Sequence, residues 1–268
     1  MVPPDPAHAP MIDLAVEILG GALVGLSLGL IGAGGAILSM PIFTLVLGHP
    51  LGVAVLEALA VTAAIATFSG ARAALARQID GARLLAFLLP GLAGAWLGGP
   101  IGAWLDDKVQ AYLFAALALV AAWRMVVTSA AAEAAEDDAA RPSAKALAAA
   151  GAIGLSVGVL TAVIGVGGGF LLIPALVLVA RLPMKRAVGT SLVLIAANSA
   201  VAFASNAHHG RENFAAIEWK PVAIVAACGI AGSVAGSALS ARLPAKALKR
   251  VFAVILVLVA ASVAIRAA

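Results

Sequence analysis

Charged residues are scarce in this chain of 268 amino acids, and that scarcity excludes most classes of protein. Asp, Glu, Lys and Arg together make up 11% of the residues, whereas hydrophobic residues make up 63%. A soluble domain carries about 25% charged residues, because its surface faces water. Soluble enzymes, nucleic-acid-binding proteins and disordered chains are therefore excluded, and an integral membrane protein embedded in the lipid bilayer remains.

Cysteine is almost absent as well. Cys228 is the single cysteine, so no intrachain disulfide can form. The sequence also lacks the clusters of Cys, His and carboxylates that bind metals, and its apolar runs lack the paired carboxylates that catalysis would need. We therefore expect no metal, no cofactor and no enzyme activity. Residues 1–10 carry no basic stretch, so a cleaved signal peptide is not expected.

What the sequence does contain is a series of long uncharged runs. Each can hold at least one helix of about 20 residues, the length that crosses a bilayer. None shows the ten-residue alternation of a membrane β-barrel. The sequence therefore predicts an all-α integral membrane protein with about eight transmembrane helices. The main runs without Asp, Glu, Lys or Arg are 18–56, 84–105, 146–180, 187–210 and 221–241.

The chain contains an internal repeat. Gly91, Gly94 and Gly98 recur with the same spacing as Gly229, Gly232 and Gly236. This register indicates duplication and predicts a first membrane repeat at 1–128, a charged cytoplasmic linker at 129–145 and a second membrane repeat at 146–268. A second set also recurs with its spacing unchanged: Gly32, Gly34, Gly35, Pro41 and Pro50 as Gly165, Gly167, Gly168, Pro174 and Pro183.

The loop charges predict that the two repeats are inverted. Residues 72–83 carry three arginines, whereas their counterpart at 207–220 mixes both signs. The turn at 48–50 carries no Lys or Arg, whereas its counterpart at 181–186 carries three. Because basic loops stay on the cytoplasmic side, equivalent loops must lie on opposite sides.

The arm that follows each glycine-rich loop is too short to cross a membrane. Residues 36–47 and 170–180 span only about 16–18 Å as helices, against a hydrocarbon core of about 30 Å. We therefore expect two short re-entrant arms whose glycine-rich tips meet near the midplane. Inverted repeats with broken helices are typical of secondary transporters.

The segments Gly165-Val-Gly-Gly-Gly-Phe-Leu-Leu-Ile-Pro174 and Ala187-Val-Gly-Thr-Ser-Leu192 resemble the TauE/SafE sulfite exporters, also called toluene-sulfonate uptake permeases. This resemblance implies transport of a small sulfur-containing anion, such as sulfite, a sulfonate or sulfoacetate, across the bacterial cytoplasmic (inner) membrane. The first repeat departs from the pattern, because Ala36 replaces Gly169 and Glu57-Ala58 replaces Thr190-Ser191.

The glycine-rich loops are the first candidate binding elements. A glycine-rich turn that opens a helix exposes backbone N–H groups to an anion, although small residues also serve close helix packing. The candidate residues are Gly34, Gly35, Gly167, Gly168 and Gly169.

Polar side chains in the second repeat are the next candidates. Thr190, Ser191 and Asn198 lie in an apolar run, and Ser191 and Asn198 share a helix face. They could donate hydrogen bonds to a sulfonate oxygen or link helices. Glu57 is an acidic residue in an apolar segment, which makes it a candidate for proton coupling or an interfacial residue.

The sequence thus predicts a transporter that exports a small sulfur-containing anion by alternating access. The inside-negative membrane potential favours anion efflux by about 2.3 kcal/mol per charge per 100 mV. Proton-coupled import of organosulfonates and a non-transporting membrane scaffold are the alternatives. The oligomeric state is left open, a homodimer included.

Overall fold

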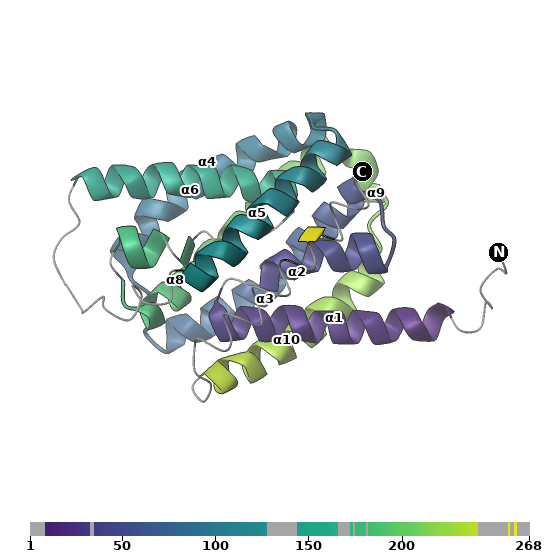
Figure 1. The fold of residues 1–268 in the computed structure, drawn as a ribbon, viewed down its shortest axis with the longest axis horizontal. Helices are drawn as coiled ribbons and strands as arrows, with labels where there is room; N and C mark the ends of the chain where they lie inside the picture. The colour runs from purple at the N-terminus through teal and green to yellow at the C-terminus, as the bar shows by residue number, and fades with distance from the viewer. Residues whose placement is uncertain are drawn as a thin grey trace.

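The structure is a computed structural model that describes residues 9–32, 35–127, 144–165, 172–173, 175–180, 182–240, 257 and 260–261. Within these residues every regular element is helical (Figure 1). The predicted linker lies largely outside them, and its last two residues begin α6. The elements are α1 (Ala9–Ile31), α2 (Gly35–Pro41), η1 (Ile42–Val46), α3 (Leu51–Leu75), α4 (Gly81–Trp104), α5 (Asp107–Val127), α6 (Ala144–Ile164), η2 (Ala175–Val179), α8 (Met184–His209), α9 (Arg211–Ala215) and α10 (Trp219–Ser240).

Four described helices are long and apolar enough to cross a membrane: α3, α4, most of α8, and α10. Shorter apolar helices cover Leu14–Leu30 in α1 and Ala148–Ile164 in α6. The expected all-helical class is confirmed for the described residues, and these helices account for part of the eight spans expected.

Equivalent prolines start the two central helices. Pro50 precedes α3 with φ −56°, and Pro183 precedes α8 with φ −55°. Proline suits this position because its φ is preset for a helix and its missing N–H would have no partner there. Helix α4 begins instead at Asp80, whose side chain accepts the N–H of Arg83 at 2.9 Å.

Helices α3 and α8 form the centre of the bundle and run in opposite directions. Gly189, in the first turns of α8, lies against Gln78, just beyond the end of α3. Gly52, at the start of α3, lies against Asn213, beyond the end of α8. Figure 1 shows α4 and α6 along one side of the molecule and α1 and α10 along the other.

Glycines allow α1 and α10 to approach closely. The space where a Cβ of Gly25 would stand is occupied by the backbone of Gly229, and that of Gly29 by the backbone of Ser233. Because both residue numbers increase together, the two helices run in the same direction. Small residues at such an interface let backbones pack without intervening side chains.

The same packing recurs between α6 and α4. A Cβ on Gly158 would overlap the backbone of Gly91, and Gly98 lies against Val159. In the register of the repeat, Gly158 is the equivalent of Gly25, and Gly91 is the equivalent of Gly229. The contact between α1 and α10 therefore recurs between their sequence equivalents, α6 and α4.

Further contacts give the direction of the remaining helices. Ser69 of α3 donates a hydrogen bond to Ser233 of α10 at 3.1 Å. The contacts between α3 and α10 follow increasing residue numbers on both helices, so the two helices run in the same direction. Gly91 and Gly99 of α4 lie against Asn198 and Ser205 of α8. Helices α1, α3 and α10 thus run one way, and α4, α6 and α8 run the other way.

The two glycine-rich loops begin at opposite ends of the central pair. Gly32 has φ +77° and lies against Val188 in the first turns of α8, whereas Gly165 has φ +72° and lies against Val55 in the first turns of α3. We call these the Gly32 end and the Gly165 end of the bundle. They are separated by roughly 30 Å, the length of about 20 helical residues. The tip residues 166–169 lie outside the described residues, so the expectation that the tips meet near the midplane stays a prediction.

The segments that follow the loops contain equivalent wide helical turns. In η1 the N–H of Leu47 donates to the carbonyl of Ile42 at 3.0 Å, and in η2 the N–H of Ala180 donates to that of Ala175, also at 3.0 Å. A π-helical turn is wider than an α-helical turn and often marks a functional site. Its recurrence at the equivalent place in the second repeat makes it part of the repeated design.

Candidate functional site

Most of the predicted binding glycines lie outside the described residues. Gly34, Gly167, Gly168 and Gly169 belong to this group, whereas Gly35 begins α2. The described residues that lead into the two loops are Gly32 and Gly165. Both have a left-handed backbone that favours glycine, so each loop starts with a sharp change of chain direction.

Ser191 attaches the first loop to the second repeat. Its hydroxyl group donates to the carbonyl oxygen of Gly32 at 3.0 Å and lies 2.8 Å from that of Val188. Ser191 is completely buried. The predicted serine therefore meets Gly32 of the other repeat, and Gly165 lies at the opposite end of the bundle.

Thr190 is also buried at the Gly32 end. Its hydroxyl oxygen accepts the N–H of Asp80 at 3.1 Å, next to the start of α4. This contact ties α8 to α4. The structure thus brings Thr190 and Ser191 together with Gly32 and places Asn198 about two helical turns further along α8.

Asn198 has no hydrogen-bond partner among the described residues for either its amide nitrogen or its amide oxygen. Its side chain is 1% exposed and faces Gly91 of α4. The equivalent contact in the other repeat joins Ile65 and Gly229, which are both apolar. An unpaired buried amide is unfavourable by about 1–3 kcal/mol, so Asn198 has unused capacity to bind a polar solute.

Glu57 lies near the start of α3 at the Gly165 end, away from Thr190 and Ser191. It is completely buried. One carboxylate oxygen accepts the N–H of Glu218 at 3.0 Å, and the other lies 2.6 Å from Nδ1 of His49. Burial places Glu57 inside the protein, within the first two turns of α3.

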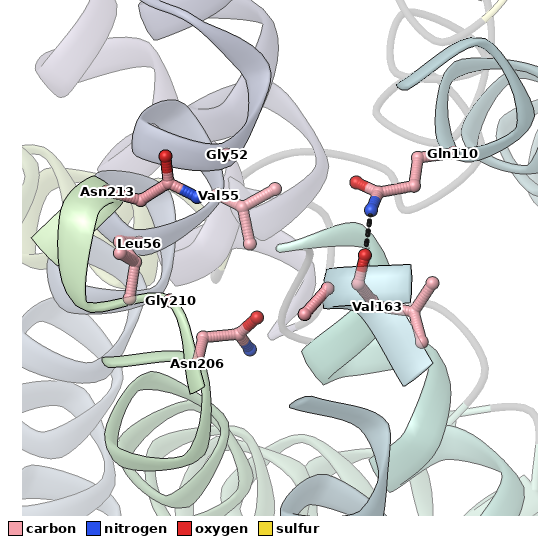
Figure 2. A pocket seen from close by; sticks show the side chains of 10 residues that line it. Gly52, Val55, Leu56, Gln110, Val163, Asn206, Gly210 and Asn213 are labelled. Carbon is pink, nitrogen blue, oxygen red and sulfur yellow. Dashed lines mark hydrogen bonds between the residues drawn. The ribbon is translucent and has the colours of Figure 1, made fainter. Parts of the chain in front are cut away.

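A small polar cavity opens at the Gly165 end (Figure 2). Its volume is about 40 Å³, which is enough for a few water molecules. Three carboxamide side chains from three helices converge on it, and none of its lining residues is charged. The lining residues are Gly52, Val55, Leu56, Gly102, Ala103, Gln110, Val163, Asn206, Gly210 and Asn213.

Two of the carboxamides also complete the ends of helices. The amide nitrogen of Gln110 donates to the carbonyl of Gly102 in the last turn of α4, as the dashed line in Figure 2 marks. The amide nitrogen of Asn206 donates to the carbonyl of Ala162 near the end of α6 at 3.0 Å. The last carbonyls of a helix have no partner within it, so these bonds hold the cavity wall together.

The sequence interpretation did not identify His49, Gln110 or Asn206. A single carboxamide in an apolar run has no distinctive spacing, because its partners come from distant segments. His49 did offer a signal, since it is a polar residue in an uncharged run and precedes Glu57 by eight positions.

The charges of the described residues are distributed unequally between the two ends. The exposed residues Lys185 and Arg186 lie in the first turn of α8 at the Gly32 end. The basic segment between α3 and α4 lies at the same end. At the Gly165 end, α9 and the start of α10 carry both acidic and basic residues. The Gly32 end is therefore the more basic of the two.

Comparison with known proteins gives a consistent result. The sequence pattern of the family described as sulfite exporter TauE/SafE matches residues 17–263. A probable membrane transporter protein of Xylella fastidiosa strain Temecula1 is 30% identical over 251 residues, which cover 92% of this chain and 94% of the relative. A protein of the same description from strain 9a5c is 30% identical over 257 residues, with the same coverage.

No solved structure matches the chain significantly. The family match covers most of the sequence, and both relatives are matched over nearly their full length. This chain is a membrane protein with transmembrane helices, and it belongs to the TauE/SafE sulfite exporter family.

Proposed function

We propose that this protein is a secondary transporter of the bacterial cytoplasmic membrane that exports a small sulfur-containing anion by alternating access. Sulfite, sulfonates and sulfoacetate are the candidate substrates. In this proposal about eight helices cross the membrane, and two inverted repeats surround the path of the anion. Each repeat contains a short broken arm that follows a glycine-rich loop.

The observation that carries this proposal is that helices of one half pack along helices of the other half. Helix α1 packs along α10 of the other half, and α6 packs along α4. Equivalent glycines make the closest approaches in both pairs. Equivalent helices run in opposite directions, as the axis of an inverted repeat requires. Such repeats can exchange their conformations, and this exchange would open the path to one side and then to the other.

The loops and helix α8 supply groups that suit an anion. Glycine-rich turns expose backbone N–H groups, and the buried amide of Asn198 adds a further donor without a partner among the described residues. Ser191 holds the carbonyl of Gly32, so it helps to position the first loop. In a low dielectric these oriented dipoles can replace part of the hydration of an oxyanion.

The charge distribution supports export. We assign the Gly32 end to the cytoplasm, because basic segments stay on that side. Basic side chains such as Lys185 and Arg186 would raise the local concentration of anions there. The membrane potential then favours movement of the anion outward, by about 2.3 kcal/mol per charge per 100 mV. Import would instead need a coupled cation.

Flux measurements in proteoliposomes test this proposal. The purified protein is reconstituted, and release of sulfite, sulfoacetate or an aryl sulfonate is followed at an imposed potential. We expect release of at least one of these anions that rises with the potential and falls in Asn198→Ile. Folded protein that moves none of them would contradict the proposal and favour a scaffold. Accumulation driven by a proton gradient against the potential would favour import.

A further inference from the structure

Three titratable side chains form a connected series at the Gly165 end. Glu218 directly precedes α10, and its side chain is 66% exposed. Its Oε1 lies 3.8 Å from Nε2 of His49, whose side chain is 13% exposed. Nδ1 of His49 lies 2.6 Å from Oε2 of Glu57, which is completely buried. The series therefore leads from the surface to a buried carboxylate in three steps.

The equivalent position in the other repeat shows which part of this arrangement is structural. There the hydroxyl oxygen of Thr190 accepts the N–H of Asp80 at 3.1 Å, just as Oε1 of Glu57 accepts the N–H of Glu218 at 3.0 Å. A hydroxyl group is therefore sufficient to attach the central helix to the start of its neighbour. The second carboxylate oxygen of Glu57 and the imidazole are not needed for that attachment.

The sequence equivalent of His49 is Leu182, which is buried and apolar. The titratable pair thus occurs in one repeat only, as an addition to a geometry that both repeats share. His49 also lies against the first arm, because it comes three residues after the end of η1, its N–H donates to the carbonyl of Phe43 at 2.9 Å, and its ring lies 5.9 Å from that of Phe43. A change in protonation at His49 would therefore act on the contact between this arm and helices α3 and α10.

Other charged residues lie near the contact that His49 and Glu57 form between the first arm and the central helix α3. Arg211 and Glu212 of α9 and Lys220 of α10 are exposed to solvent. Glu17 of α1, which packs against η1 and α10, is a further buried carboxylate near this end. Among the described residues, His49 forms ion pairs with Glu57 and Glu218.

We propose that Glu218, His49 and Glu57 form a proton relay that couples anion transport to proton entry from the Gly165 end. A proton from the outer solution binds the carboxylate of Glu218 and passes through a bridging water molecule to Nε2 of His49, since 3.8 Å is too long for a direct hydrogen bond. His49 releases its Nδ1 proton to Oε2 of Glu57, so one proton moves inward and the imidazole is again neutral. This loss of charge on Glu57 weakens its contact with His49 and frees the first arm to move.

This inference rests on the proposed transport function, and one experiment separates the two. Proteoliposomes containing the wild-type protein are loaded with sulfite and with a pH-sensitive dye, and anion release and internal pH are recorded together. If one proton accompanies each anion, a gradient of about one pH unit changes the steady-state anion ratio about tenfold, since 1.4 kcal/mol corresponds to that factor. Absence of any anion flux contradicts the proposed function. Flux without a response to the gradient contradicts the relay alone.

Two variants test the residues themselves. The double variant His49→Leu with Glu57→Thr copies the residues of the other repeat, so it keeps an acceptor for the N–H of Glu218 but loses both titratable groups. His49→Gln leaves the bond between Glu57 and Glu218 intact and still offers a hydrogen-bond donor. We expect anion flux to persist in both variants with no response to the pH gradient.

The matched control is Glu212→Gln, which removes an exposed carboxylate on the adjacent α9 and should retain the full response. A full tenfold response in His49→Gln would overturn the relay. If the double variant does not fold, as judged by its melting temperature, His49→Gln alone decides the question.

Discussion

The close contact between α4 and α6 gives the sharpest stability prediction. Gly151 and Gly158 lie on the same face of α6, two turns apart. A Cβ on Gly158 would lie 2.7 Å from the backbone nitrogen of Ala95 and would overlap the carbonyl of Gly91. A Cβ on Gly151 would lie 3.6 Å from Cγ of Pro90, which is an ordinary contact. The variants Gly158→Ala and Gly151→Ala thus add the same methyl group in two different environments.

The expected magnitudes follow from these distances. Ordinary carbon contacts lie at about 3.5–4.0 Å, so Gly158→Ala must separate the two helices by about 1 Å. A gap of that size forfeits a quarter to a half of the dispersion energy of each contact, and we expect a loss of about 3 kcal/mol in the free energy of unfolding. Gly151→Ala should be neutral or more stable by up to about 1 kcal/mol, because alanine favours helix formation.

Denaturant unfolding of the detergent-solubilised protein, followed by tryptophan fluorescence, measures both variants against the wild type. The equivalent change in the other pair, Gly25→Ala, should destabilise as strongly as Gly158→Ala, because Gly25 meets the backbone of Gly229 in the same way. Equal stability of Gly158→Ala and Gly151→Ala would refute the close packing, and an unaffected Gly25→Ala would refute the equivalence of the two pairs.

Three further outcomes are expected. Asn198→Ile should raise the free energy of unfolding by about 1–2 kcal/mol, because it removes a buried amide without a partner among the described residues. The same variant should lower anion flux, and unchanged flux would show that Asn198 is not part of the site. Gly48→Ala should cost about 1 kcal/mol for its left-handed backbone alone, whereas Gly32→Ala should cost clearly more because Val188 fills the space beside it; equal losses would contradict that contact. Ser191→Ala should cost about 1–3 kcal/mol by leaving the carbonyl of Gly32 unpaired, while the exposed Ser156→Ala serves as its control and should stay near the wild type.

Much of the architecture could be predicted from local features of the sequence. The scarcity of charge and the uncharged runs predict membrane helices, since a helix must satisfy its own backbone in lipid. Pro50 and Pro183 recur in the register of the repeat, and the structure shows that both precede central helices. The family was identified from the segments around Gly165 and Ala187, and the match over residues 17–263 confirms it.

The geometry of the candidate site could not be predicted in the same way. The sequence singled out Thr190 and Ser191 as candidates but did not say which distant segment they would meet. In the structure Ser191 bonds to Gly32, which is 159 residues away.

The membrane class, the duplication and the basic loops were inferred from composition and from spacing along the chain. These inferences need no knowledge of tertiary contacts. Which halves exchange helices, and which side chains meet at Gly32 and at Glu57, depends on packing between distant segments. The bond between Glu57 and Glu218 spans 161 residues, and it forms because α10 starts beside the first turns of α3. That placement is a property of close glycine packing in three dimensions, which residue spacing does not encode.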